Sequence, residues 1–257
     1  MGTFSEGLKE QKLIVYTVST GGYDGVLEPL VTDENTAYIF YTDRPPENYT
    51  GVWEFRPVEN PDKLDPGRLS RYYKFHPHVL FPNDEYSVYI DANTLLKKSL
   101  RAYIDRYSKD ASMLCQRHSE RNCLYNEAKI VTSYRFDDPA VVSRQMQRYR
   151  AEGFPEHYGM IEANVLSRRH HDQPLIAVME TWWDEVLNGS RRDQLSFSYA
   201  VWKNHYTYDA APICSFDNEN WTALGHGNAK RRMMKSKAPS LFTKEALLYL
   251  IGKGPMP

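Results

Sequence analysis

Short apolar runs alternate with amphipathic stretches along most of this chain. The apolar runs are rich in Val, Ile, Tyr and Phe, which favour a pleated, buried surface, so they predict strands. The predicted strands cover residues 12–17, 37–41, 52–55, 86–90, 112–115 and 162–166. Apolar residues at helical spacing predict helices over residues 68–80, 95–107, 122–131, 139–152, 174–187 and 244–251, and one that opens at Ser190. This alternation indicates an α/β domain with a largely parallel, covered sheet.

The 257 residues are enough for one large α/β domain. Residues 1–11 are polar and are predicted to be a disordered leader, and residues 12–228 are predicted to form the domain. Residues 229–257 form a C-terminal extension with five basic residues within eight positions and an amphipathic helix. The basic and apolar stretch 229–251 would favour an anionic membrane surface, or it would dock back onto the domain.

The composition excludes some classes of protein and indicates the cellular setting. The formal net charge of −1 argues against a general nucleic-acid binder, which would carry a basic excess. Three cysteines without a CxxC pair favour a reduced, intracellular setting. No apolar run approaches the ~18 residues of a membrane span, and the N-terminus lacks a signal-peptide core. We therefore expect a cytoplasmic protein, with peripheral contact at the inner face of a membrane as a further option.

The predicted strand over residues 86–90 ends on an acid, a small residue and an amide: Asp91, Ala92 and Asn93. Sheets of α/β domains bind ligands at the carboxyl ends of their strands. Two oxygen donors one residue apart can hold a hard divalent cation. Because Asp and Asn are also common turn residues, an Asx turn that ends the strand is the alternative.

Two earlier strands also end in polar loops. Residues 19–24 contain Gly22 and Tyr23, and a glycine-bearing loop lets the backbone approach a phosphate or ribose closely. Asp43 follows the second strand and could bind the base or ribose hydroxyls of a nucleotide. A plain turn explains both segments equally well.

The predicted helix over residues 68–80 carries Arg71 and Lys74 three positions apart, hence on one face. A pair of cations that faced a pocket would neutralise a diphosphate, whereas most charged helix faces are merely solvated. Asp193 lies among arginines near a helix start and would stay ionised as a nucleophile, a base or a cation stabiliser. A helix cap formed with Ser190 is the alternative for Asp193.

These stretches, in this order, resemble the nucleotide-binding half of a GT-A glycosyltransferase, and more specifically the glycosyltransferase-like family catalogued as "domain of unknown function 616", which includes plant pectin and mucilage enzymes. The matching stretches are Val15-Tyr16-Thr17, Gly21-Gly22-Tyr23-Asp24, Tyr41-Thr42-Asp43, Arg71-Tyr72-Tyr73-Lys74, Pro77-His78, Tyr89-Ile90-Asp91-Ala92-Asn93, Arg121-Asn122-Cys123-Leu124-Tyr125 with Glu127, Arg168-Arg169-His170, Trp182-Trp183 and Ser190-Arg191-Arg192-Asp193-Gln194-Leu195-Ser196-Phe197. The resemblance implies a GT-A-like, Rossmann-related fold: a mixed, mostly parallel sheet flanked by helices in a single domain, with a C-terminal helical extension.

The resemblance also implies roles for individual residues. The residues implied to bind a nucleotide-sugar donor are Thr17, Gly22, Tyr23, Asp43, Arg71, Lys74, Asp91, Ala92, Asn93, Arg192 and Gln194. A divalent cation, Mn²⁺ or Mg²⁺, would be held by Asp91, Asn93 and the glycine-flanked His226. Because Asn93 stands where such motifs carry a second acid, the metal would be less neutralised. Asp193 would be the catalytic carboxylate near the anomeric carbon, with Glu162 as the second candidate.

We therefore expect a metal-assisted glycosyltransferase that moves a sugar from a nucleoside-diphosphate sugar to a glycan or glycolipid acceptor, as in surface polysaccharide synthesis. A retaining outcome is favoured over an inverting one. The alternative is a non-catalytic module with the same fold that binds nucleotide sugars or carbohydrates. Asn93 in place of an acid favours this alternative.

Overall fold

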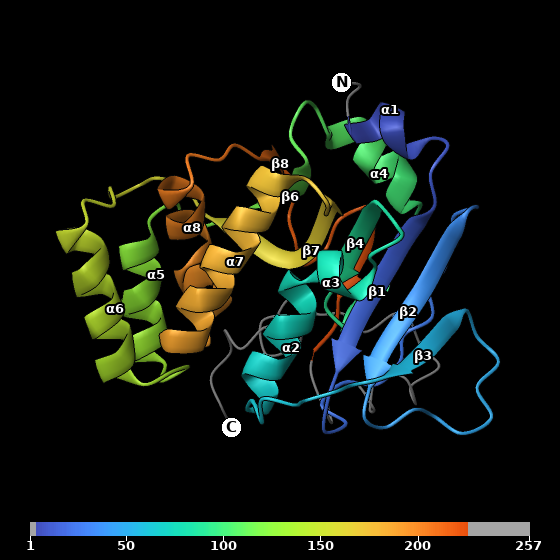
Figure 1. Cartoon of the computed structure of the whole chain (residues 1–257), viewed down its shortest axis with the longest axis horizontal. Helices are drawn as coiled ribbons and strands as arrows, with labels where there is room; N and C mark the ends of the chain where they lie inside the picture. Colours follow the sequence, from blue (N-terminus) through green and yellow to red (C-terminus); the bar gives the residue numbers. More distant parts are fainter. Residues whose placement is uncertain (1–3, 226–257) are drawn as a thin grey trace.

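The computed structural model describes residues 4–225 and is built on one seven-stranded sheet (Figure 1). Its strands, in spatial order, are β3 (Trp53–Pro57), β2 (Thr36–Thr42), β1 (Leu13–Ser19), β4 (Tyr86–Ile90), β7 (Ile161–Arg169), β6 (Met113–Arg117) and β8 (Asp209–Ala211). Strand β7 runs antiparallel to both of its neighbours, and every other pair in this sheet is parallel. The predicted mixed, mostly parallel sheet flanked by helices is confirmed.

Helices cover one face of the sheet through an apolar core. They are α2 (Pro66–Phe75), α3 (Pro77–Leu80), α7 (Gln173–Asn188) and α8 (Phe197–Lys203). Strand β1 alternates its side chains, so Ile14 and Tyr16 point into this core and Val15 into the opposite one. Phe75 stacks on Trp182 with ring centroids 4.1 Å apart, which joins α2 to α7. This packing holds α2 against α7 on this face of the sheet.

The opposite face is covered by α1 (Phe4–Leu8) and α4 (Leu100–Tyr107), together with a two-stranded antiparallel sheet of β5 (Thr94–Leu96) and β9 (Trp221–Ala223). The expectation that residues 1–11 are disordered is wrong for α1. Phe4 and Leu8 lie one helical turn apart and are both buried, and Phe4 stacks on Tyr86. Most residues in the segment 1–11 are polar, so the apolar face formed by Phe4 and Leu8 was not detected in the sequence.

A third helical group lies at the end of the molecule away from β3 (Figure 1). It contains α5 (Leu124–Ser133), α6 (Pro139–Ala151) and the short 3₁₀ helix η1 (Asp193–Leu195), which pack with α8. Tyr149 and Tyr199 stack with centroids 3.8 Å apart at the centre of this group. The group thus anchors η1, and with it Asp193, to the rest of the fold.

Three predicted helices need correction. The helix over residues 68–80 is broken at His76, because Pro77 lacks an amide hydrogen and disfavours helical backbone before it. The helix over 95–107 starts only at Leu100, after a Ser99 cap, and residues 94–96 form strand β5. No helix opens at Ser190: η1 begins at Asp193 and α8 at Phe197.

The predicted C-terminal extension over residues 229–257, including the stretch 229–251, lies outside the described residues. Between residues 4 and 225, no helix is both long and apolar enough to cross a membrane. The carboxyl ends of β1, β2, β3 and β4 meet at one edge of the sheet, and the antiparallel β7 begins at the same edge. The predicted site residues gather along this edge.

Candidate functional site

A buried ion pair between Lys74 on α2 and Asp193 on η1 lies at the centre of this edge. Lys74 Nζ is 2.7 Å from Asp193 Oδ2, and the two side chains are 2% and 8% exposed. Arg71 Nε lies 3.2 Å from the same carboxylate oxygen. Burial alone would raise the pKa of Asp193, but Arg71, Lys74 and Arg192 outweigh it and hold that pKa well below its usual range. Asp193 is therefore ionised, as predicted.

The backbone around both partners is held by buried side chains. Arg168 of β7 is fully buried and donates a hydrogen bond to the Lys74 carbonyl oxygen at 2.8 Å and another to the Tyr16 hydroxyl at 2.6 Å. Trp182 donates its indole N–H to the Asp193 carbonyl oxygen at 2.9 Å. These contacts fix α2 against β7 and η1 against α7, so the ion pair is preorganised.

Asp91 extends the group of charges toward solvent. Its Oδ1 accepts a hydrogen bond from the Tyr89 hydroxyl at 3.0 Å and lies 3.8 Å from Lys74 Nζ. The Asp91 side chain is 35% exposed, in contrast to Asp193. Burial, and then the Asp91 charge, raise the pKa of Tyr89 well above its usual value, so its hydroxyl stays protonated and donates. Lys74 thus lies between a buried carboxylate and an accessible one.

Ala92 and Asn93 form the turn that follows. The Thr94 amide donates to the Asp91 carbonyl oxygen at 2.9 Å, and Ala92 is buried. The Asn93 side-chain amide donates to the Leu224 carbonyl oxygen at 2.6 Å, so this residue also ties the turn to the segment after β9. The strand therefore ends in a main-chain turn, and the Asp91 carboxylate remains partly exposed.

The predicted cation site is not completed by the described residues. Asp91 supplies a carboxylate and Asn93 an amide, and His226 lies outside the described range. Within residues 4–225, no group of three His, Cys, Asp or Glu side chains could hold a metal ion. A cation bound here would thus depend on ligands beyond Asp91 and Asn93.

A second carboxylate, Glu162 at the start of β7, is held by two neighbours. Gln194 donates its side-chain amide to Glu162 Oε2 at 2.9 Å. His118 Nε2 lies 3.5 Å from Glu162 Oε1. His118 Nδ1 accepts the backbone N–H groups of Glu120 and Arg121, which places the imidazole hydrogen on Nε2, facing Glu162. Glu162 is thereby linked to η1, one residue from Asp193.

The loop after β1 is tied to the end of β2. Gly21 and Gly22 both have positive φ, a conformation that glycine adopts freely, and the Gly21 amide donates to the Asp43 carboxylate at 2.9 Å. Tyr23 is 64% exposed, and its phenol is near enough to contribute to the raised pKa of Arg71. Thr17 is buried, and its hydroxyl has no hydrogen-bond partner among the described residues. Asp43 therefore shapes the loop, and Tyr23 is exposed on it.

The structure brings most of the predicted residues together around Arg71, Lys74, Asp91 and Asp193. Sequence reasoning assigned no role to four residues that build the same edge, although three of them lie in the stretches that carry the resemblance: Tyr89, His118, Arg168 and Trp182. Tyr and Trp combine an apolar ring with a hydroxyl or an indole N–H that can form a hydrogen bond. This property of the residue type could have indicated that Tyr89 and Trp182 contribute to the site. No sequence signal indicates that His118 or Arg168 faces this edge, because each contact spans distant segments.

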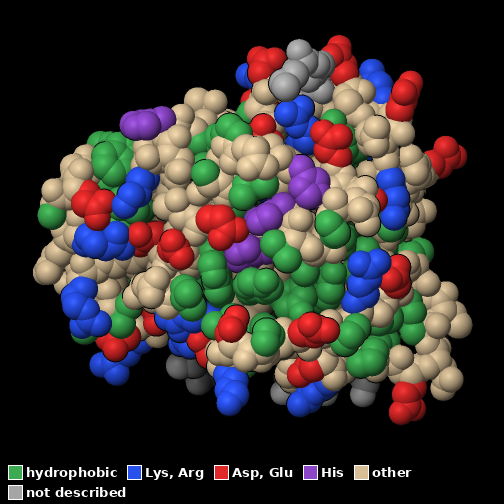
Figure 2. All heavy atoms as spheres, viewed as in Figure 1, with side chains coloured by type: hydrophobic (Ala, Val, Ile, Leu, Met, Phe, Trp, Pro, Cys, Tyr) green, Lys and Arg blue, Asp and Glu red, His purple; other side chains and the backbone are tan. Residues whose placement is uncertain are grey.

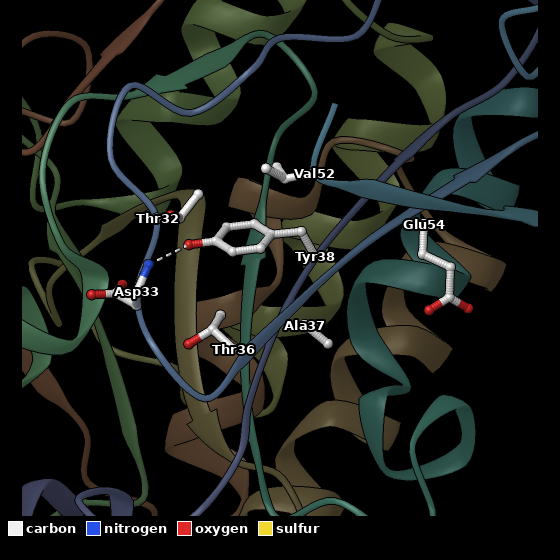
Figure 3. A pocket seen from close by; sticks show the side chains of 7 residues that line it. All are labelled: Thr32, Asp33, Thr36, Ala37, Tyr38, Val52 and Glu54. Carbon is white, nitrogen blue, oxygen red and sulfur yellow. Dashed lines mark hydrogen bonds between the residues drawn. The ribbon is translucent and has the colours of Figure 1, made fainter. Parts of the chain in front are cut away.

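Two other features lie away from this edge. A hollow of about 360 Å³ at the amino end of β2 is lined by Thr32, Asp33, Thr36, Ala37, Tyr38, Val52 and Glu54 (Figure 3). Its polar groups serve the fold: the Asp33 amide donates to the Tyr38 hydroxyl, and the Asp33 carboxylate caps α4 at the Leu100 amide.

The second feature is a histidine cluster. Figure 2 shows histidine side chains in a row on the face that carries α2, α3 and α7. His76 Nε2 and His78 Nε2 lie 3.5 Å and 3.1 Å from the Glu180 carboxylate. Burial lowers the pKa of both imidazoles, so they are neutral near pH 7. This cluster joins α2 and α3 to α7.

The fold and the ion pairs define a covered α/β domain with charged groups at the carboxyl edge of its parallel strands. Residues 19–226 match the family described as "TOD1/MUCI70, glycosyltransferase-like domain". The match covers most of the chain, and the chain belongs to this family.

The chain also resembles individual proteins. The "Probable hexosyltransferase MUCI70" of Arabidopsis thaliana is 28% identical over 182 residues, which cover 66% of this chain and 31% of that protein. The chain thus matches less than a third of the length of this relative. Two solved structures, each aligned over 80% of this chain, are the WbbM bifunctional glycosyltransferase (TM-score 0.46, 12% identity, 39% of that chain) and mouse xyloside xylosyltransferase 1 (TM-score 0.45, 10% identity, 88% of that chain). Both likenesses are remote.

Proposed function

We propose that this domain is a glycosyltransferase that moves a sugar from a nucleoside-diphosphate sugar to a glycan or glycolipid acceptor. The observation that supports it best is the grouping of Arg71 and Lys74 with the carboxylates Asp91 and Asp193 at the carboxyl edge of the parallel strands. Ligands of α/β sheets bind at this edge. Membership of a glycosyltransferase-like family supports the same class of reaction.

Arg71 and Lys74 would neutralise the diphosphate as it leaves. The bond from the anomeric carbon to the diphosphate oxygen breaks with its electron pair on the diphosphate, so negative charge grows there. Cations already held in position stabilise that charge without reorganisation. Arg168 holds the backbone of Lys74 in place. The side chain of Arg71 is partly exposed, so a diphosphate could reach its guanidinium and replace Asp193 as its ionic partner.

A divalent cation belongs to the same proposal. Asp91 and Asn93, with His226, would hold Mn²⁺ or Mg²⁺, which when bound would share the diphosphate charge with the two side-chain cations. The exposed Asp91 carboxylate supports this part, and the nearby Lys74 means that the site keeps positive charge without a metal.

Asp193 is the proposed catalytic carboxylate, and Glu162 is the reserve. Asp193 stays ionised, so it could stabilise positive charge at the anomeric carbon in a retaining reaction, with Gln194 beside it. The acceptor hydroxyl forms the new bond and gives up its proton to a carboxylate or to the departing phosphate. The loop residues Thr17, Gly22 and Tyr23, with Asp43, Ala92 and Arg192, are the remaining proposed donor contacts.

The first test is a thermal-shift panel of nucleoside diphosphates and nucleotide sugars, with Mn²⁺, Mg²⁺ or a chelator. A ligand that binds the native state raises the melting temperature by mass action, so no acceptor is needed. The wild type should be stabilised by one base, Arg71→Met should lose most of the shift, and Lys98→Met, an exposed control, should keep it. The absence of a shift for every nucleotide would overturn donor binding.

A non-catalytic binding module is the second candidate, because Asp193 is engaged by two cations and Asn93 replaces an acid. Asp193→Asn separates the two candidates. An enzyme should lose transfer or donor hydrolysis by orders of magnitude while the nucleotide still raises the melting temperature. If the wild type binds the nucleotide but neither transfers nor hydrolyses the sugar, the binding module is the better description. The anomeric configuration of a product, read by NMR, decides between retention and inversion.

A further inference from the structure

Two stacked aromatic rings are exposed on the loop that joins α5 to α6. Tyr134 and Phe136 are 63% and 45% exposed, and their rings stack with centroids 5.6 Å apart and planes 15° apart. Exposed single apolar residues are ordinary, but two stacked rings present their remaining faces and edges to water as one apolar surface. Such a surface is a candidate for contact with the apolar face of a ligand.

The loop holds these rings in one position. Phe136 N–H donates to the Val131 carbonyl oxygen and Arg135 N–H to that of Thr132, which is the hydrogen-bond pattern of a Schellman cap at the end of α5. Arg135 itself has φ 53°, a left-handed conformation that costs a non-glycine residue free energy. On the other side, Asp138 caps α6 by accepting the Ala140 amide at 2.8 Å. The rings are therefore presented by a fixed backbone.

The same loop is tied to the candidate site. Asp137 accepts hydrogen bonds from the Ser190 hydroxyl at 2.7 Å and the Arg191 amide at 2.9 Å. The Arg192 guanidinium lies over the Phe136 ring, 5.4 Å from its centroid. Its Nε has no hydrogen-bond partner among the described residues, and its charge helps to lower the pKa of Asp193. Arg192, which is also a proposed donor contact, precedes Asp193 in the chain, so the aromatic rings border the proposed donor site.

We propose that Tyr134, Phe136 and Arg192 form a subsite that holds one pyranose ring of the acceptor glycan. The apolar face of a sugar ring stacks on aromatic rings, while the guanidinium donates hydrogen bonds to its hydroxyls or to a carboxylate. Position supports the acceptor over the donor. The loop that carries the rings joins α5 and α6 at the end of the molecule away from β3, whereas the glycine loop and Asp91 follow β1 and β4 of the sheet (Figure 1). This inference rests on the proposed transferase function and adds where its acceptor binds.

The test uses the whole chain and a printed array of oligosaccharides built from neutral hexoses, pentoses and hexuronates. The wild type should bind a subset of these glycans, and Phe136→Ala and Tyr134→Ala should each weaken that binding about tenfold. Phe136→Trp should restore it. Val79→Ala, which removes an exposed apolar side chain on α3, should leave it unchanged. Selective binding of hexuronates would assign the Arg192 contact to a carboxylate, and binding of neutral glycans would assign it to hydroxyls.

The nucleotide thermal shift, measured on the same variants, separates the two proposals. If Phe136→Ala keeps the nucleotide thermal shift of the wild type but loses glycan binding, the result supports an acceptor subsite distinct from the donor site. Equal glycan binding by wild type and Phe136→Ala, or no binding by the wild type, overturns the subsite. Glycan binding that needs Phe136 but comes with no shift for any nucleotide keeps the carbohydrate site and overturns the transferase.

Discussion

Lys74 Nζ and Asp193 Oδ2 lie 2.7 Å apart although 119 residues separate the two positions in the sequence. Both side chains are almost completely buried, and removing two charges from water is costly, so the pair persists because each charge compensates the other. Arg71 and Asp91 extend it into a row of alternating charge. The pair also joins α2 to η1, so it links the sheet-covering helices to the α5–α6 group.

The first prediction is a double-mutant cycle on this pair. Lys74→Met and Asp193→Asn should each reduce the free energy of unfolding by about 3–5 kcal/mol, because each leaves the other charge buried without its partner. The double variant should cost less than the sum of the two, with a coupling of about 1–3 kcal/mol. Urea unfolding at pH 7 measures all four proteins. Strict additivity would show that the two groups do not interact in solution.

The second prediction concerns how the stability of the protein changes at low pH. The pKa of Asp193 is depressed in the folded protein, whereas in the unfolded chain it is near its usual value of about 3.9. Between these two values only the unfolded state binds the proton, so the stabilisation by Asp193 is present above about pH 5 and is lost as the pH falls toward the folded pKa. The stability difference between wild type and Asp193→Asn should therefore shrink from pH 5 to pH 3.

Urea midpoints at pH 7, 5, 4 and 3 measure this difference, and the variant serves as the control for all other carboxylates. A difference that stays constant over this range would mean that the pKa of Asp193 is not lowered by folding.

The third prediction tests Arg168 as a positioning residue. Arg168→Lys cannot bridge the Lys74 carbonyl and the Tyr16 hydroxyl with one planar group, and should reduce the free energy of unfolding by about 1.5–3 kcal/mol. The neighbouring Arg169→Lys, whose partners lie at 3.6–3.7 Å on a more exposed surface, should cost less than about 1 kcal/mol. Arg168→Lys should also reduce the rise in melting temperature that a nucleoside diphosphate gives. Each rise is measured from the variant's own melting temperature, so a loss of stability alone would not reduce it.

The fourth prediction uses backbone strain. Arg135 and His205 each adopt positive φ just after a helix, with the same pair of capping hydrogen bonds, and both are exposed. Replacement of either by Gly should raise the free energy of unfolding by about 1 kcal/mol, because glycine adopts this conformation without the Cβ clash. The matched Arg135→Ala and His205→Ala variants keep the clash, so a gain as large as that for Gly would point to the lost side chain instead.

Local pattern was enough to predict six of the seven strands of the main sheet, and the three-residue strand β8 was not predicted. Each predicted strand is present because buried strands read as apolar runs, and Asp91 at the end of β4 could be expected at a ligand-binding edge. Arg71 and Lys74 were expected on one face of a helix for the same kind of reason, since their spacing is local. The break at Pro77 could have been predicted too, because it follows from proline chemistry alone.

The sequence by itself thus determined the α/β class, six strands of the main sheet and the polar residues that follow them, because these depend on residues close together in the chain. Only the tertiary structure decided that β7 runs antiparallel, that Lys74 pairs with Asp193, and that Arg168 and Trp182 hold the backbones of that pair. It also decided that the loop with Tyr134 and Phe136 lies against Arg192. These contacts join distant segments, and their partners are chosen by packing of the whole core, which no local pattern encodes.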